Sequence, residues 1–417
     1  MSIATEFDPI GQTFEGLYAQ LARARAEAPV FFWEAQQCWV ISRHADVAAV
    51  LNDKEHFTVE GILGVLNRDY CPEANRILAD GIDFLRTPQV NGVEGADHAR
   101  LRGILQTVLT PQRFRQMEPA VRKHVTQLID GFRADGACDI VARLCYPLPV
   151  RVIFDVIGFK IEEENLAQLQ EWSDDYFRMW LAPLTDEEQV RCAKHIVEFQ
   201  NYTRAKLDDR RKHPRDDLMT DFVRQIDSGE SKVTEDEVVI MFPMNLIGAG
   251  HETTKSALSN ALHQLLREPS RWQAIVQNPE TIPDVVEECL RFDTSVPAWY
   301  RIVREPVTVG GQHLPKGARV IVLLAAANHD EERFADAAQF CPARNAGQNR
   351  AGHLTFSYGR HFCPGAPLAR IELRIALEEM SRRLPGLRLA ANQSIEFEPN
   401  LSTRVIKALR LEWDPSA

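Results

Sequence analysis

One loop constrains this chain more than any other stretch. Phe356-Ser-Tyr-Gly-Arg-His-Phe-Cys-Pro-Gly365 presents a single cysteine, Cys363, between two glycines. Gly359 and Gly365 allow backbone conformations and close approaches that a Cβ atom would prevent, so a flat partner could lie against the loop. The run from Pro367 has apolar residues at helical spacing, which predicts that Cys363 lies just before a helix N-terminus. The free N–H groups and the helix dipole at such a position favour a thiolate over a thiol.

A shielded thiolate is a soft, anionic metal ligand or a nucleophile. Cys363 has no CxxC motif and no neighbouring cysteine, which argues against zinc and against an iron–sulfur cluster. The residues alone leave open an axial ligand to haem iron, a nucleophile, or an ordinary buried cysteine.

The spacing of Phe356, Gly359, Cys363 and Gly365 resembles the haem-binding loop of the cytochrome P450 superfamily, Phe-x-x-Gly-x-x-x-Cys-x-Gly. The resemblance implies a mainly α-helical fold with small β-sheets, with haem b buried between a long distal helix and the proximal cysteine loop and helix. It implies that Cys363 binds the iron and that Phe356 and Gly365 contact the haem. It covers nearly the whole chain, as one haem domain with a strand-containing N-terminal part to about residue 95 and a helical core over 96–417.

A second motif, Gly250-His-Glu252-Thr253, lies in a helix expected over Asp236–Leu266. Glycine is unfavourable inside a helix unless something must approach its backbone closely. An acid followed by a threonine can relay protons, although a mid-helix threonine often bonds back to a carbonyl one turn earlier. The stretch resembles the family's oxygen-activation motif, which implies that Gly250, Glu252 and Thr253 are catalytic.

A third motif, Glu288-Cys-Leu-Arg291, resembles the family's Glu-x-x-Arg ion pair. By itself it is a common helical pair worth a few tenths of a kcal/mol. If it is buried, as the resemblance implies, a third partner is needed, and Arg344 is the candidate. The segment around Arg344 departs from the family's usual Pro-Glu/Asp-Arg-Phe form.

Haem propionates need cations or hydrogen-bond donors. The resemblance assigns this role to His98, Arg102, Arg301 and His361. It also implies that Ala249 and Gly248 leave room over the haem and that Asn245 is a polar group of the substrate pocket. The expected substrate contacts are Asn245, Gly248, Val296, Ala298, Phe177, Trp180 and Leu401. A methionine and aromatic stripe over 172–181 is equally typical of a core.

Composition narrows the classes of partner. A net charge of −11 argues against nucleic acid, and the longest apolar run, Val320–Ala327, is too short to span a bilayer. Eight scattered cysteines and a polar start indicate a reducing cytoplasm. We expect a cytoplasmic, bacterial-style monomer. Five arginines are candidates for docking an acidic electron donor, with a scatter of solvated arginines as the alternative: Arg100, Arg113, Arg115, Arg360 and Arg370.

The resemblance implies a monooxygenase that uses O2, performing hydroxylation or oxidative dealkylation of a small organic molecule. Because the chain ends about 50 residues after Cys363, we expect no fused reductase and electrons from a separate ferredoxin with its reductase. Segments resembling enzymes that oxidise aromatic ethers point weakly to an aromatic substrate. A peroxide-driven enzyme and a haem-thiolate sensor remain as alternatives, although neither explains the Glu252-Thr253 pair.

The pattern also predicts individual elements. They are a helix over Phe14–Ala28, strands over Val30–Trp33 and Cys38–Ser42, a helix over Ala45–Leu51, an irregular region with a short helix over 57–95, helices over 99–291 with breaks near Pro183 and Pro214, and strands around 307–309, 320–324 and 410–413.

Overall fold

The computed structural model describes residues 2–62, 70–84, 86–159, 164–181, 184–230, 232–345 and 352–415. The chain forms two compact units. The first contains residues 1–58, 118–148 and 252–417, and the second contains 59–117 and 149–251. The organisation as one haem domain stays a prediction.

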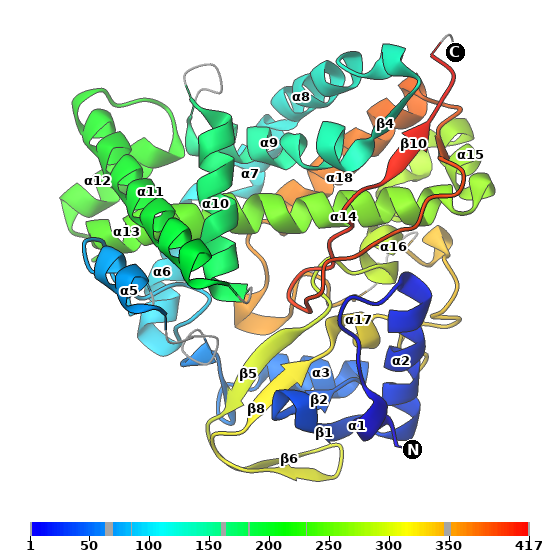
Figure 1. The fold of residues 1–417 in the computed structure, drawn as a ribbon, viewed down its shortest axis with the longest axis horizontal. Helices are drawn as coiled ribbons and strands as arrows, with labels where there is room; N and C mark the ends of the chain where they lie inside the picture. The colour runs from blue at the N-terminus through cyan, green and yellow to red at the C-terminus, as the bar shows by residue number, and fades with distance from the viewer. Residues whose placement is uncertain are drawn as a thin grey trace. The chain divides into compact units, whose positions relative to one another are not determined.

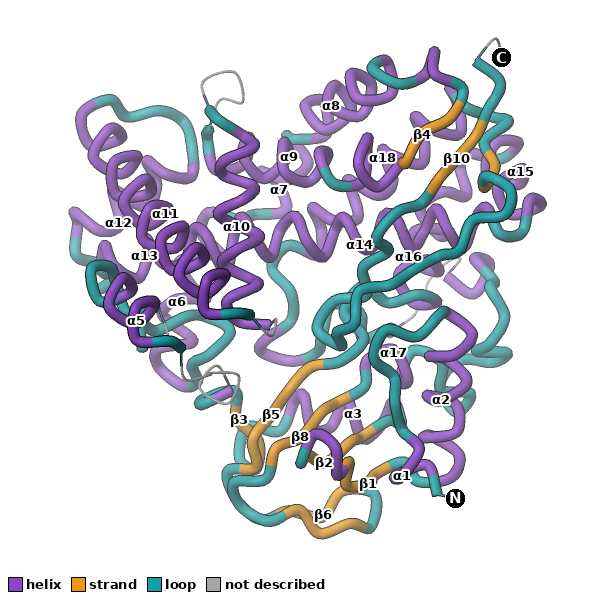
Figure 2. Tube along the Cα trace, viewed as in Figure 1, coloured by secondary structure: helices purple, strands orange, loops and turns teal. Residues whose placement is uncertain are grey.

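The first unit contains all the described strands. A five-stranded sheet has the order β1-β2-β8-β5-β3, and smaller sheets pair β4-β10-β9 and β6-β7 (Figure 2). The strands are β1 Val30–Trp33, β2 Cys38–Ile41, β3 Phe57–Thr58, β4 Ala137–Asp139, β5 Trp299–Val303, β6 Val307–Val309, β7 Gln312–Leu314, β8 Arg319–Val322, β9 Arg388–Leu389 and β10 Arg410–Glu412.

Alternation along β8 places its side chains on both faces of the five-stranded sheet. Ile321 packs with Phe31 and Val40 in one apolar cluster, whereas its neighbours Val320 and Val322 pack in another. A strand whose residues are buried on both faces reads as a continuous apolar run, as this one does. In Figure 1 β1, β2, β8 and β5 lie side by side.

Most of α14 Ala249–Leu266 belongs to the first unit, from Glu252 onward, together with further helices. They are α1 Ile3–Glu6, α2 Phe14–Glu27, α3 His44–Asn52, α8 Glu118–Asp130, α15 Pro269–Gln277, α16 Ile282–Phe292, α17 Leu324–Ala327 and α18 Ala366–Arg383, with the shorter turns η1 Glu34–Gln36, η2 Arg133–Asp135, η3 Val141–Cys145, η6 Pro279–Thr281, η7 Pro342–Asn345 and η8 Gly359–His361.

The second unit is helical. Its elements are α5 Pro72–Leu78, α6 Gly95–Val108, α7 Pro111–Gln116, α9 Pro147–Ile157, α10 Leu166–Leu181, α11 Asp186–Lys212, α12 Leu218–Ser228, α13 Glu235–Met241 and η5 Phe242–Gly248, followed by the start of α14 Ala249–Leu266. α10 packs along α11, as Figure 1 shows. Thr185 and Glu188 form a capping box at the start of α11, which begins with three acids and ends with three bases in accord with the helix dipole.

Most predicted elements are confirmed within a residue or two. The first helix ends at Glu27, the second strand at Ile41, and β10 at Glu412. The strand expected to reach Leu324 ends at Val322, because Leu324-Ala-Ala-Ala327 forms α17 instead, in keeping with the high helix propensity of alanine. The break near Pro214 is confirmed between α11 and α12, whereas Pro183 lies outside the described residues.

The helix expected over Asp236–Leu266 is helical throughout but changes type. α13 is followed by the π-helical segment η5 and then by α14. Pro243 has no N–H to donate, so an ordinary α-helical ladder cannot continue through it. π-helical segments often occur at functional sites. This one immediately precedes the Gly250-His-Glu252-Thr253 motif.

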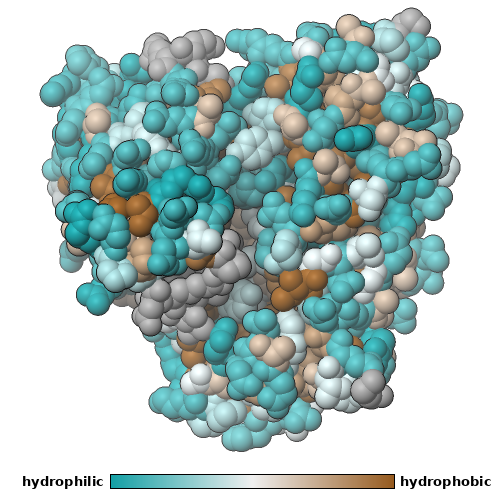
Figure 3. Space-filling model, in the orientation of Figure 1, coloured by the Kyte–Doolittle hydropathy of each residue, from teal (hydrophilic) through white to brown (hydrophobic). Residues whose placement is uncertain are grey.

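The protein's surface is charged. Its 59 acids and 48 bases leave a net charge of −11, and hydrophilic side chains predominate on the face shown in Figure 3, with hydrophobic ones in small groups. Within the described ranges, no helix combines the length and apolar character needed to cross a bilayer.

Candidate functional site

Cys363 lies in the first unit, in the loop between η8 and α18. Its N–H donates to Phe356 O at 2.9 Å, and its carbonyl accepts from Ala366 N at 3.4 Å. The side chain is partly exposed. Because α18 begins at Ala366, the cysteine precedes the positive end of the helix dipole, as the sequence predicts.

The two glycines of this loop have different roles. Gly359 has φ +72°, and a Cβ there would lie 3.0 Å from Asn52 Oδ1 and 3.2 Å from Leu51 O at the end of α3. Gly359 is therefore required both by its backbone and by the close approach of α3. Gly365 has φ −82°, and its Cβ would lie 3.8 Å from Cys363 Sγ. A Cβ at this position would make only an ordinary contact with the sulfur, so neither the backbone nor the described neighbours require glycine here.

Most of the other cysteines are poor candidates for a thiolate. Burial raises the pKa of Cys38 and Cys138 to about 11 and that of Cys192 to about 12. Burial also raises the pKa of Cys145 and Cys289 far above the ordinary value. These five remain protonated thiols at neutral pH, so they offer no soft anion to a metal.

The acid–threonine motif lies in the first turns of α14. The Glu252 carboxylate accepts from Lys255 Nζ at 2.7 Å, and the Lys255 ammonium lies 5.1 Å from the centre of the Tyr146 ring. Ala249 is exposed and Thr253 is partly exposed, whereas Thr254 and Ser256 are buried. Residues four apart share a helix face, so a small residue and the threonine line one accessible face of α14.

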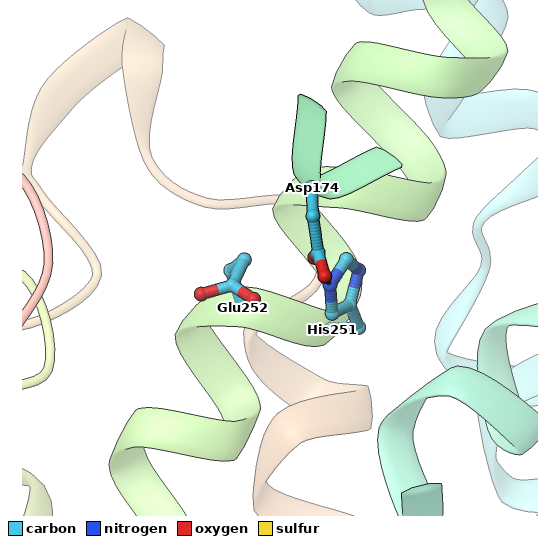
Figure 4. Close-up of side chains that lie close together, drawn as sticks. All are labelled: Asp174, His251 and Glu252. Carbon is cyan, nitrogen blue, oxygen red and sulfur yellow. Dashed lines mark ion pairs between the residues drawn. The ribbon is translucent and has the colours of Figure 1, made fainter. Parts of the chain in front are cut away.

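Gly250 and His251 show why the preceding turn of this helix belongs with the second unit. A Cβ at Gly250 would lie 3.2 Å from Ile153 Cδ1, so the glycine lets α9 pack closely. His251 Nδ1 lies 3.0 Å from Ile247 O, and its Nε2 lies 3.6 Å from Asp174 Oδ1 on α10 (Figure 4). The His251 side chain is 1% exposed and that of Asp174 is 43% exposed. No local sequence pattern predicts this pair, because its two residues come from different helices.

The third motif forms a buried ion-pair network. Glu288 and Arg291 on α16 are both 0% exposed and are joined by two hydrogen bonds of 2.7 and 2.9 Å. Arg344 Nε lies 3.2 Å from Glu288 Oε1, where the third partner was expected. Arg291 also donates to the carbonyls of Asn328, Ala337 and Gln339, so the buried charges are well satisfied.

The four propionate candidates come from both units. His98 and Arg102 lie one turn apart on α6 in the second unit, and His98 is buried. Arg301 on β5 and His361 in η8 belong to the first unit. Arg301 is 2% exposed and donates from Nη1 to Tyr300 O at 2.8 Å. A guanidinium this deeply buried requires anionic or strongly polar surroundings.

The substrate candidates fall into separate groups. Ala298 and Leu401 share one apolar cluster of the first unit, and Val296 packs against the other. In the second unit Phe177 packs onto Gly248, because a Cβ there would lie 1.9 Å from Phe177 Cε2. Asn245 donates to Asn91 Oδ1 at 3.2 Å. Trp180 lies in α10, but its side chain is outside the described part of the structure.

The arginines considered for docking are less available than expected. Arg100 pairs with Glu237, Arg113 with Asp221 and Arg370 with Glu287. Arg115 is exposed. Pairing with an acid reduces the field that an arginine presents to a partner. In each pair the acid is distant from the arginine in the chain, so no local sequence pattern predicts that the two residues meet.

These residues fit a haem. In the first unit a partly exposed thiol precedes a helix N-terminus, the Arg301 guanidinium is buried, and Thr253 is partly exposed on α14 beside Glu252. In the second unit the buried His98 imidazole lies on α6. A thiolate is the donor that a haem-thiolate centre needs, and buried cations suit propionates.

Comparisons with known proteins agree with this geometry. A family model described as Cytochrome P450 matches residues 93–384. The chain is 31% identical to Cytochrome P450 monooxygenase PikC of Streptomyces venezuelae over 97% of this chain and 93% of that protein.

Solved structures extend the similarity to the fold. Cytochrome P450 CREJ in complex with (4-ethylphenyl) dihydrogen phosphate is 31% identical, with a TM-score of 0.89 over 99% of this chain and 100% of that one. An intact type IV self-sufficient cytochrome P450 monooxygenase is 33% identical, with a TM-score of 0.90 over 100% of this chain and 54% of that one. The expected mainly helical fold with small sheets is confirmed.

Proposed function

The chain belongs to the cytochrome P450 family and is a haem-containing monooxygenase, and we propose that it hydroxylates or oxidatively O-dealkylates a small organic substrate. In the overall reaction one atom of O2 enters the substrate and the other leaves as water, at the cost of two electrons and two protons. The observation that carries the assignment of the metal ligand is the setting of Cys363. Its backbone N–H is held by Phe356 O, directly before α18.

Cys363 is the proposed haem-iron ligand, and a bound haem would supply O2 activation with electron density donated by the thiolate. His98, Arg102, Arg301 and His361 would hold the propionates through charged hydrogen bonds. Phe356, Gly365 and Ala249 would contact the haem faces.

Residues of α14 would deliver the protons that the reaction needs. Thr253 would donate from its hydroxyl at the accessible face, and Glu252 would resupply it. The Lys255 ammonium at 2.7 Å holds the Glu252 carboxylate in place in the described conformation. Gly250 would keep the backbone close to the site.

The substrate and partners are further parts of the proposal. Aromatic compounds are the first class to test, because the sequence resembles that of oxidisers of aromatic ethers and the similar protein CREJ was solved with an aromatic phosphate. Asn245, Gly248, Val296, Ala298, Phe177, Trp180 and Leu401 would line the pocket. A separate ferredoxin with its reductase would supply electrons to a cytoplasmic monomer.

The test of the iron ligand is spectroscopic. The reduced, carbon-monoxide-treated protein should absorb at the long-wavelength position typical of thiolate ligation, and Cys363→Ala should abolish that band. Cys71→Ala, which changes another partly exposed cysteine, should keep it. A wild-type spectrum typical of histidine-ligated haem would refute the assignment.

The test of the reaction is a substrate screen. Aromatic ethers, acids and terpenoids are added to the oxidised protein to find the spectral shift that follows displacement of iron-bound water. Hits are then incubated with reduced ferredoxin and O2. Product formed only with peroxide would favour the peroxide-driven alternative, and binding without turnover would favour a sensor.

A further inference from the structure

A second acid lies beside the buried Glu288 motif. Glu287 accepts from Arg370 Nε at 2.5 Å and from Arg370 Nη2 at 3.0 Å, which is a two-pronged contact between α16 and α18. It also lies 3.2 Å from His353 Nε2. The His353 Nδ1 atom accepts from Thr355 N at 3.4 Å, so the Nε2 atom carries the proton that points to Glu287.

This acid is a carboxylate at neutral pH. Burial alone would raise its pKa, but the hydrogen bonds from His353 and Arg370 and the charge of Arg370 outweigh it and lower the pKa of Glu287 to about 2. Arg370 therefore has a full countercharge, and the pair is held in a partly desolvated position.

Arg370 in turn contacts the cysteine loop. Its guanidinium carbon lies 4.5 Å from the centre of the Phe356 ring, within the range of a cation–π contact. Phe356 O is the acceptor of the Cys363 N–H, at 2.9 Å. A continuous series of contacts thus joins Glu287, Arg370, Phe356 and the backbone of Cys363, all within the first unit.

The Glu288 network mainly contacts a different segment. Arg291 and Arg344 bind the carbonyls of residues 335–339, so that network holds the segment before η7. The Glu288 network also approaches the loop, because Arg291 donates to Asn328 O and the Asn328 side chain accepts from Leu354 N at 2.7 Å, whereas the Glu287 series contacts Phe356 within the loop itself. Some residues do not bind a metal but hold one of its ligands in place. Substituting such a residue typically lowers metal affinity or activity 10–100-fold.

We propose that Glu287, Arg370 and Phe356 are positioning residues for Cys363, which fix its backbone and balance the charge beside its loop. This rests on the proposed role of Cys363 as the haem ligand. Two measurable consequences follow. Loosening the series speeds haem loss, and leaving Arg370 without its carboxylate raises the reduction potential of the iron, because nearby positive charge favours the reduced form.

The matched experiment compares Glu287→Gln with Glu379→Gln in the haem-loaded protein. Glu379 is, like Glu287, an acid paired with a neighbouring arginine: it is buried and contacts Arg122 at 2.7 Å and Arg382, but it lies far along α18 from the loop. Glu287→Gln should speed transfer of haem to an acceptor protein by about 10–100-fold and raise the midpoint potential. Glu379→Gln should leave both the rate of haem transfer and the midpoint potential close to their wild-type values, because distant sites act independently.

Further variants separate charge from packing. Glu287→Gln with Arg370→Gln removes both charges, so the potential should return toward the wild-type value while haem loss stays fast. Phe356→Leu removes the ring under Arg370 but keeps the ion pair, so the potential should stay at the wild-type value. If Glu287→Gln fails to fold, Arg370→Lys, which keeps the charge but loses the two-pronged contact, should show faster haem loss.

The outcomes distinguish this proposal from the function on which it rests. Equal effects of Glu287→Gln and Glu379→Gln, or a change in unfolding alone, would overturn the positioning role while a thiolate-type spectrum still stood. A wild-type protein without that spectrum would instead refute the ligand assignment itself.

Discussion

Two regions that carry motifs are held together by different means. Around Glu288 on α16, buried charges satisfy one another, because Glu288 pairs with both Arg291 and Arg344. In the second unit, the region of η5 and α10 is π-helical in part and contains buried polar atoms for which the described residues supply no hydrogen bond. These atoms are Asn245 Oδ1, Ser173 Oγ and Tyr176 Oη.

The contrast shows which region has one preferred geometry. A satisfied network of charges penalises any rearrangement, because each displaced partner leaves a buried charge behind. Polar atoms without partners carry no such penalty and gain if a rearrangement brings them a donor, an acceptor or water. We therefore expect the first region to be rigid and the second to adapt to what binds there.

The largest expected effect would come from breaking the first region. Glu288→Gln leaves Arg291 without its countercharge at a fully buried site, which should destabilise the fold by about 3–5 kcal/mol. The measurement is the free energy of unfolding from urea titration. Glu305→Gln removes an exposed partner of Lys316 and serves as the control, with no measurable change expected. If Glu288→Gln and Glu305→Gln have the same free energy of unfolding, the first region is not rigid in the way proposed.

The next effect concerns proton supply at α14. Thr253→Ala should keep haem and substrate binding but divert electrons to hydrogen peroxide, because losing one proton-relay group costs about 10²–10⁴-fold in the dependent step. Peroxide and product are measured per electron consumed. Thr254→Ala, one residue along and buried, should keep normal coupling. Unchanged coupling in Thr253→Ala would make Thr253 a packing residue.

The smallest expected effect comes from a substitution in the second region, at Gly248 in η5. Gly248→Ala places a methyl group 1.9 Å from Phe177 Cε2, so Phe177 must move. We expect a loss of about 1–3 kcal/mol, measured by thermal unfolding, together with altered substrate affinity. Adding Phe177→Leu should restore most of the stability. If Gly248→Ala is as stable as the wild type and binds substrate equally well, Phe177 moves at no cost, and the packing of Phe177 on Gly248 does not constrain this region.

Sequence reasoning succeeded where the chemistry demands a particular residue at a fixed spacing. Cys363 before a helix, the Glu288–Arg291 pair and Arg344 as its third partner are such cases. It failed where packing between distant segments selects partners. Arg370 was considered for an exposed docking face, but it pairs with Glu287 and stacks on Phe356.

The helix before the acid–threonine motif lies between these cases. Its extent was predicted, but its π-helical segment Phe242–Gly248 was not. Pro243 was the available signal, because a proline inside a helical pattern removes a backbone donor. The sequence does not show whether the helix kinks, breaks or widens at Pro243. That outcome depends on packing between distant segments, and here α10 packs against this segment.

The order of the five-stranded sheet has a consequence during synthesis. β2 pairs in parallel with β8, so that Val40 meets Ile321, which is 281 residues later in the chain (321 − 40). At a synthesis rate of roughly 5–20 residues per second, β2 leaves the ribosome about 15–60 s before its partner exists. During that interval its apolar residues have no partner strand on that side, so the nascent N-terminal segment is where we expect chaperones to bind.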